Sequence, residues 1–204
     1  MSIQTVGIIG AGTMGNGIAQ ACAVSGVNVV MVDISDAAVA KGLATVSGSL
    51  DRLIKKEKIT EADKAAALSR IKTSTSYDDL KGAQLVIEAA TENYDLKVKI
   101  VKQLDGMLAH EAIIASNTSS ISITKLAAVT TRADRFIGMH FFNPVPMMAL
   151  VEIIRGLQTS DATHAAVHDL STRLGKSPIT VKNAPGFVVN RILVPMINEA
   201  FFVL

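Results

Sequence analysis

The stretch Thr5–Gly15, TVGIIGAGTMG, decides the fold of this 204-residue chain. Its first five residues form a short apolar run that predicts a buried strand, and the pattern GxGxxG follows at once. We expect Gly10 to permit a tight turn and Gly12 to let the backbone approach a pyrophosphate. Gly15 then allows the next helix to pack closely on the strand.

An acidic residue extends this motif. The helix that opens at Thr13 and Met14 directs free N–H groups toward phosphates, and Asp33 ends the second predicted strand, Asn28–Val32. A carboxylate there accepts hydrogen bonds from the adenosine ribose and repels a 2′-phosphate, so the expected cofactor is NAD rather than NADP. The alternative is that Asp33 caps the following helix. With the glycine motif in register, we favour the ribose.

Short β-branched runs alternate with helical patterns over the first half of the chain. Further strands are predicted at residues 84–89 and 112–115, and apolar residues recur at helical spacing from Leu96 to Leu108, with Lys97 on the outer face. This alternation predicts parallel strands joined by helical crossovers. We therefore expect an α/β fold of the Rossmann type, a doubly wound, mostly parallel sheet with helices on both faces.

Residues 36–70 interrupt this alternation: they carry no strand pattern and predict one or two helices, the second capped by Thr60. After Ser120 the pattern changes. Farther along, strands are predicted at residues 136–140 and 150–155, on either side of the turn Asn143-Pro144-Val145-Pro146. Such a strand, turn and strand can bring distant side chains together.

The clearest domain boundary is Asn183-Ala184-Pro185-Gly186. We expect residues 1–182 to form the α/β domain and residues 183–204 to form a linker and the first helix of a helical domain. That helix carries an apolar stripe and has no stop signal at Leu204, which predicts a truncated end.

Composition and charge narrow the function classes. Apolar residues make up 49% and aromatic residues 4%, which excludes a disordered chain and an aromatic platform for nucleic acids. The net charge of +2 predicts no polyanionic partner. Cys22 is the only cysteine, so no disulfide is available within the chain, and a reducing, cytoplasmic setting is expected. We expect no metal site and no membrane span.

Two titratable residues form a candidate proton-transfer pair. His140 ends a predicted strand, at the sheet edge where open α/β proteins keep their active sites, and Glu152 lies among aliphatic residues. A carboxylate that orients an imidazole supports proton abstraction from a hydroxyl group, which beside a nicotinamide becomes alcohol oxidation. Taken alone, His140 is better interpreted as a core histidine and Glu152 as a member of a structural ion pair. Together they favour catalysis.

Polar residues follow another predicted strand. Ser116-Asn117-Thr118-Ser119-Ser120 comes after residues 112–115, so Asn117 and the hydroxyl groups are candidates to hold a nicotinamide ribose, a carboxamide or a substrate oxygen. The alternative is a capped helix, and both interpretations can hold for different residues. Lys56 lies in a lysine-rich stretch that is typical of a solvated helix face, with phosphate binding as the alternative.

The chain resembles the 3-hydroxyacyl-CoA dehydrogenase family, in particular the short bacterial 3-hydroxybutyryl-CoA dehydrogenases. The resemblance covers the whole chain. It rests on GxGxxG at residues 10–15, EAATEN at 88–93, SNTSS at 116–120, HFFNPVP at 140–146, LVEI at 150–153 and PGFVVNR at 185–191.

This resemblance implies reversible, NAD-dependent oxidation of an (S)-3-hydroxyacyl-CoA thioester to the 3-ketoacyl-CoA. His140 matches the general acid/base of the family and Glu152 its orienting carboxylate. Ser119 and Asn190 match residues that hydrogen-bond the reacting oxygen and the thioester. The resemblance also implies dinucleotide contacts for Asp33, Glu92, Lys97, Ser119 and Asn143, and CoA contacts for Ser49 and Lys56.

Family members continue into a helical domain that supplies dimer contacts, so the resemblance implies a homodimer when that domain is present. Two other functions stay open. One is a dinucleotide sensor or structural protein on the same fold, against which Ser119, His140, Glu152 and Asn190 argue together. The other is a dehydrogenase of free β-hydroxy acids, a chemistry that commonly uses a catalytic lysine.

Overall fold

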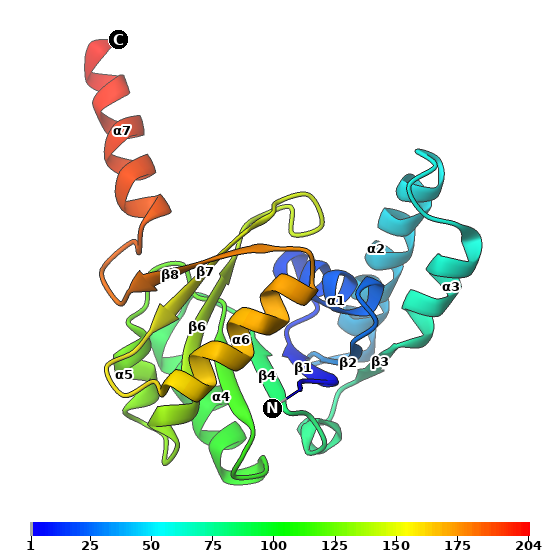
Figure 1. The fold of residues 1–204 in the computed structure, drawn as a ribbon, viewed down its shortest axis with the longest axis horizontal. Coiled ribbons are helices and arrows are strands. Elements are labelled where there is room, and N and C mark those ends of the chain that lie inside the picture. The colour runs from blue at the N-terminus through cyan, green and yellow to red at the C-terminus, as the bar shows by residue number, and fades with distance from the viewer. Residues whose placement is uncertain (1) are drawn as a thin grey trace.

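The computed structural model describes residues 2–204 and places eight strands in one sheet with helices on both faces (Figure 1). The spatial order is β3-β2-β1-β4-β5-β6-β7-β8, and all neighbours run parallel except β6 and β7, which are antiparallel. The predicted α/β fold is confirmed. The strands are β1 (Thr5–Ile9), β2 (Asn28–Val32), β3 (Ile71–Ser74), β4 (Leu85–Glu88), β5 (Ile113–Ser116), β6 (Phe136–Phe141), β7 (Leu150–Arg155) and β8 (Ser177–Lys182).

Seven α-helices and two short 3₁₀ helices connect the strands in the described residues. Side chains of α1, α2, α3 and α6 pack on one face of the sheet, and those of α4 and α5 pack on the other. The helices are α1 (Thr13–Val24), α2 (Asp36–Ile54), α3 (Glu61–Ser69), η1 (Tyr77–Leu80), α4 (Tyr94–Met107), α5 (Ile123–Ala127), η2 (Ala133–Arg135), α6 (Asp161–Arg173) and α7 (Val189–Val203).

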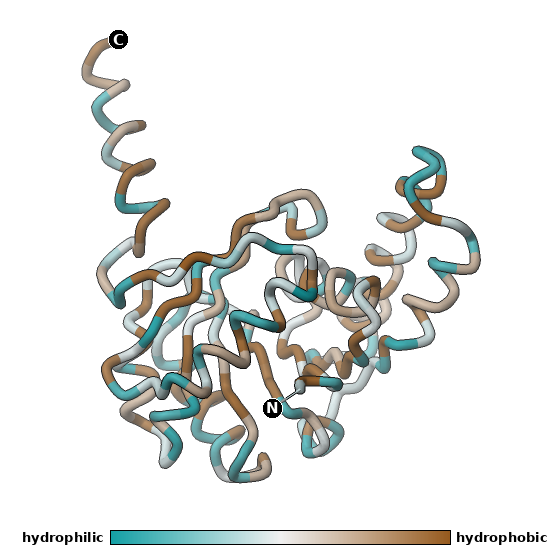
Figure 2. Tube along the Cα trace, viewed as in Figure 1, coloured by the Kyte–Doolittle hydropathy of each residue, from teal (hydrophilic) through white to brown (hydrophobic). Residues whose placement is uncertain are grey.

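Alternation along the strands creates two separate apolar cores. Ile8 belongs to the core under α1 and α6, whereas its neighbour Ile9 belongs to the core under α4 and α5, and Ile153 and Ile154 divide in the same way. The central strands are apolar in nearly every position, as the brown sheet segments of Figure 2 show. A parallel sheet covered on both faces requires such strands.

One strand was missed, and one predicted helix face is wrong. No strand was predicted at Ile71–Ser74, where β3 pairs with β2 at the sheet edge. Lys97 was predicted on the outer face of α4, but Lys97 is 1% exposed and Leu96 is 45% exposed. The reason for the second error is an ion pair, because Glu88 at the end of β4 draws the Lys97 ammonium into the protein.

The C-terminal helix α7 projects away from the sheet (Figure 1). Its apolar residues are exposed, including Leu193, Ile197 and Phe201. The division into two domains at residues 182 and 183 stays a prediction. Among the described residues, the helices are all too short or too polar to cross a membrane.

Candidate active site

A cavity of about 370 Å³ opens at the carboxyl ends of β4, β5 and β6. In open α/β sheets, ligands bind at this edge, near the point where the strand order reverses, which here lies between β1 and β4. The cavity brings together residues predicted from six separate stretches of sequence. They are Met14, Glu92, Lys97, Asn117, Ser119, His140, Asn143 and Asn190.

His140 and Glu152 meet as the sequence predicts. They are directly paired across the antiparallel strands β6 and β7, and Glu152 Oε2 lies 2.8 Å from His140 Nδ1. A carboxylate oxygen at this distance accepts a hydrogen bond, so Nδ1 carries the hydrogen of the imidazole. Nε2 has no hydrogen-bond partner within residues 2–204, and the ring lines the cavity.

Two aromatic side chains flank the imidazole. The ring centroids of Phe142 and Phe187 lie 4.5 Å and 5.7 Å from that of His140. The His140 side chain is 8% exposed and Glu152 is fully buried. In such apolar surroundings a hydrogen bond between the ring and the carboxylate is stronger than it would be in water.

The second oxygen of Glu152 holds the start of α7. Its Oε1 accepts hydrogen bonds from the backbone N–H groups of Val188 at 2.9 Å and Val189 at 3.0 Å. Gly186 and Phe187 have φ values of 74° and 51°, and this left-handed turn directs the two N–H groups toward the carboxylate. The same carboxylate therefore fixes the imidazole and the segment that carries Asn190.

Glu92 organises the polar loop after β5. Its Oε1 accepts hydrogen bonds from the Thr118 hydroxyl at 2.6 Å and from the N–H and hydroxyl groups of Ser119 and Ser120 at 2.9–3.1 Å. Burial acts to raise the pKa of this carboxyl. The hydrogen bonds from the loop and the ammonium of Lys97 outweigh burial, so the pKa of Glu92 lies below its usual value.

Lys97 reaches the floor of the cavity from α4. Its Nζ lies 2.5 Å from Glu88 Oε2 and 3.8 Å from Glu92 Oε2, and the Ser116 hydroxyl donates to the same Glu88 oxygen. The remaining Glu88 oxygen accepts the N–H of Ala90. These contacts satisfy both buried charges, which is the condition for a stable buried ion pair.

The side chains of Asn117 and Asn190 make hydrogen bonds with backbone groups at the cavity wall. Asn117 Oδ1 accepts the N–H of Phe141 at 2.9 Å and so ties β5 to β6. Asn190 Nδ2 lies 3.5 Å from the carbonyl oxygen of Ser119, a long hydrogen bond. Both amides line the cavity.

The glycine loop leaves room for a dinucleotide. Gly12 caps α1 with φ −66°, which any residue can adopt, and a Cβ atom added there would meet nothing within 4 Å. The protein itself thus leaves open the space above the loop, and no side chain among the described residues caps the first turn of α1. By contrast, a Cβ at Gly15 would lie 1.7 Å from the Gly10 carbonyl oxygen. These residues fit a pyrophosphate at the helix N-terminus.

Asp33 lies beside this loop. Its Oδ2 accepts the N–H of Ala11 at 2.6 Å and its Oδ1 accepts the N–H of Ile34 at 2.7 Å. It lines a cavity of about 300 Å³ together with Gly12 and Thr13. Ser35, not Asp33, caps α2. The helix-cap alternative is therefore wrong, and Asp33 stays the proposed ribose ligand.

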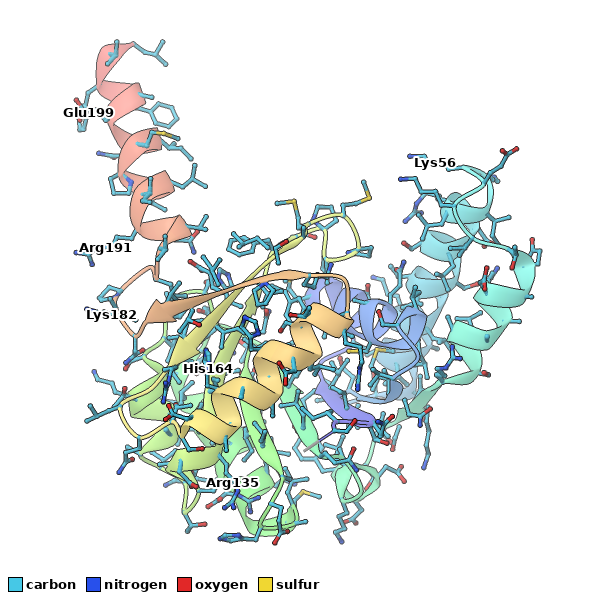
Figure 3. All side chains as sticks on the ribbon, viewed as in Figure 1. Lys56, Arg135, His164, Lys182, Arg191 and Glu199 are labelled. Atoms are coloured by element: carbon cyan, nitrogen blue, oxygen red, sulfur yellow. The ribbon has the colours of Figure 1, made fainter. Side chains whose placement is uncertain are left out.

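A second cavity of about 340 Å³ adjoins the first. Both predicted CoA residues line it: Ser49 lies on α2, and Lys56 lies in the turn just after the end of α2 at Ile54 (Figure 3). Arg52, one helical turn from Ser49 on α2, lines the same cavity and was not predicted, although this spacing could have indicated it. Residues of α1 and of the β6–β7 loop complete its lining, and Asn143 of that loop lines both cavities.

Comparison with known proteins identifies the family. Residues 5–184 match the model of the 3-hydroxyacyl-CoA dehydrogenase NAD binding domain. The chain belongs to this family. Residues 5–184 form the NAD-binding domain of the family. NAD is therefore the cofactor, and the chain is an oxidoreductase.

Relatives of the 3-hydroxyacyl-CoA dehydrogenase family match nearly the whole chain. A 3-hydroxybutyryl-CoA dehydrogenase of Bradyrhizobium diazoefficiens is 52% identical over 202 residues, which are 99% of this chain and 69% of that protein. The mitochondrial hydroxyacyl-coenzyme A dehydrogenase of Rattus norvegicus is 47% identical over 97% of this chain and 65% of its own length. The crystal structure of (S)-3-hydroxybutyryl-CoA dehydrogenase from Ralstonia eutropha is 82% identical, with a TM-score of 0.97 over 98% of this chain and 71% of that one.

Proposed function

We propose that this chain catalyses the reversible, NAD-dependent oxidation of a short-chain (S)-3-hydroxyacyl-CoA, 3-hydroxybutyryl-CoA above all, with His140 as general acid/base. The observation that carries the proposal is the His140–Glu152 pair, which leaves Nε2 in a cavity that also contains the start of the dinucleotide-binding helix, at Met14. Relatives named for the same reaction support the substrate class.

His140 handles the proton. When bound, NAD supplies the acceptor for the hydride. As the alcohol carbon becomes a ketone, Nε2 of His140 takes the hydroxyl proton and the ring becomes an imidazolium. Glu152 Oε2, 2.8 Å from Nδ1, stabilises that positive charge and keeps the ring in the tautomer that presents a free Nε2. In the reverse direction Nε2 returns the proton to the carbonyl oxygen.

Ser119 and Asn190 position the substrate in this proposal. They enter the same cavity from different elements, the loop after β5 and the first turn of α7. The Asn190 amide and the Ser119 hydroxyl supply hydrogen-bond donors for the reacting oxygen and the thioester, and the hydroxyl turns from Glu92 Oε1 to the substrate to do so. Glu92 also binds the backbone N–H groups of Ser119 and Ser120, which holds the loop in place during that change.

The CoA portion occupies the second cavity in this proposal. Ser49 and Arg52 of α2 line this cavity together with Lys56 of the following turn, and Arg and Lys side chains are suited to phosphate groups. Because Asn143 lines both cavities, a thioester chain can pass from one to the other. A free hydroxy acid would leave this second cavity without a role.

The experiment is an absorbance assay of NADH oxidation by the full-length protein. We expect turnover of acetoacetyl-CoA, no turnover of free acetoacetate, and inhibition by free CoA. Turnover of the free acid without CoA inhibition would support the β-hydroxy acid reaction, for which Lys97 is the lysine in the first cavity. NADH binding without turnover of either compound would instead indicate a dinucleotide sensor.

A further inference from the structure

Lys176 lies outside both cavities but binds the loop that separates them. It occupies the turn between α6 and β8, and its half-buried side chain reaches the β6–β7 loop, which comprises residues 142–149. Its Nζ donates hydrogen bonds to the carbonyl oxygens of Val145 at 2.6 Å and Met148 at 2.9 Å. Figure 1 shows the loop beside the segment that joins α6 to β8.

The loop has few other polar anchors. Among the described residues, Lys176 is the only donor to the carbonyl oxygens of Val145 and Met148. Within the loop, the carbonyl oxygen of Pro144 accepts the N–H groups of Met147 and Met148. Next to the lysine, the N–H of Ser177 donates to the Ala149 carbonyl oxygen. The lysine therefore satisfies two carbonyl groups that the loop cannot satisfy by itself.

An apolar anchor holds the opposite side of the loop. The Val145 side chain is buried against α1, where a Cβ atom added to Gly17 would lie 2.9 Å from Val145 Cβ. Val145 thus packs toward α1 through its side chain while its carbonyl oxygen binds Lys176. Two anchors of different chemistry define the position of the loop.

The loop forms part of both cavity walls. Phe142 and Asn143 line the cavity of His140, and residues 143–147 line the cavity of Ser49 and Lys56. A displacement of this loop would therefore change the path from the CoA portion to the imidazole. Small displacements of positioning groups reduce rates strongly.

We propose that Lys176 is a positioning residue, which holds the β6–β7 loop in the place that aligns a bound acyl-CoA with His140. Because Lys176 lines neither cavity, it acts only through the loop. The inference rests on the proposed acyl-CoA function for its kinetic consequence, whereas the clamp on the loop follows from the hydrogen bonds alone.

The test compares three variants of the full-length protein. Lys176→Met removes the donors and keeps the length of the side chain, and Lys176→Arg restores donors. Lys182→Met is the matched control, because Lys182 is an exposed lysine at the other end of β8 (Figure 3). We expect Lys176→Met to raise KM for acetoacetyl-CoA by at least about tenfold, with a smaller change in kcat. Lys176→Arg should recover most of this loss, and Lys182→Met should stay within about twofold of the wild type.

Hydrogen exchange provides a second readout that does not depend on activity. We expect the Met147 and Met148 amides to exchange at least about tenfold faster in Lys176→Met than in the wild type or Lys182→Met. Unchanged exchange would overturn the clamp, and faster exchange with unchanged KM would overturn the positioning role. If Lys176→Met does not fold, Lys176→Gln takes its place under the same criteria.

Failure of the proposed function would be recognised separately. If the wild type turns over no acyl-CoA, the acyl-CoA function fails, and so does the alignment that depends on it. The exchange rates then decide the clamp by themselves.

Discussion

His140 and Glu152 stand directly opposite each other in the antiparallel pair of β6 and β7, with 2.8 Å between Nδ1 and Oε2. The other carboxylate oxygen binds the N–H groups of Val188 and Val189. One buried side chain therefore connects the proposed base to the start of the helix that contributes Asn190. Such double use makes Glu152 sensitive to substitution.

We expect Glu152→Gln to lower kcat by about 10²- to 10⁴-fold, because an amide can present its N–H₂ to Nδ1 and favour the wrong tautomer. NAD affinity, measured by fluorescence titration, should stay within about twofold of the wild type. The exposed residue Glu111 gives a matched control, Glu111→Gln, for which we expect full activity. An equal loss of NAD affinity in Glu152→Gln would refute the assigned role.

Two alanine substitutions in the glycine loop should differ in their effects, one on NAD affinity and the other on stability. Gly12→Ala adds a methyl group in open space at an ordinary φ, so we expect a normal thermal unfolding midpoint but an NAD affinity at least about tenfold weaker. Gly15→Ala places its Cβ 1.7 Å from the Gly10 carbonyl oxygen, so we expect loss of stability before any effect on binding. Calorimetry and NAD titration of both variants check this, and full NAD affinity in a folded Gly12→Ala protein would contradict it.

The buried ion pair of Lys97 and Glu88 supports a stability prediction. Lys97→Met leaves a buried carboxylate without its cation, and we expect the free energy of unfolding to fall by about 3–5 kcal/mol in denaturant titrations. Adding Glu88→Gln should recover part of this loss, because the unpaired charge disappears. Lys99→Met, an exposed neighbour on α4, serves as the control. Equal stability of the Lys97 and Lys99 variants would show that the pair contributes nothing.

Because of Glu92, we expect the free energy of unfolding to depend on pH in the acid range. Its pKa is lower in the folded chain than in the unfolded chain, so its contribution to stability is fully present above the ordinary glutamate pKa of about 4.3. That contribution disappears as the pH falls through the lower, folded-state pKa. We expect Glu92→Gln to flatten the fall in unfolding free energy below about pH 5. Urea titrations of both proteins at several pH values measure the free energy of unfolding. The same pH profile in Glu92→Gln as in the wild type would contradict a lowered pKa of Glu92 in the folded chain.

Much of the fold follows from local patterns. The β-branched runs of β1 and β2, the glycine loop and the Thr60 cap are short-range features, and the structure confirms them. The meeting of His140 with Glu152 was also predictable, because a strand, turn and strand constrain which residues face each other.

Features set by distant partners were not predictable in this way. The half-exposed strand β3 carries polar residues at the sheet edge, where pairing with β2 rather than local pattern defines it. Lys97 looks like a surface lysine in sequence, and it is buried because it pairs with Glu88 at the end of the preceding strand, β4. Lys176 likewise has no local signal, since its partners belong to a loop about thirty residues away.

The most direct test of the whole account is the effect of His140→Ala on turnover and on NAD affinity in the same preparation. Loss of a general base predicts a kcat for acetoacetyl-CoA lower by about a hundredfold or more, with the dissociation constant for NAD nearly unchanged. Near-normal turnover, or a loss of NAD binding as large as the loss of rate, would contradict the placement of His140 Nε2 at the reacting oxygen.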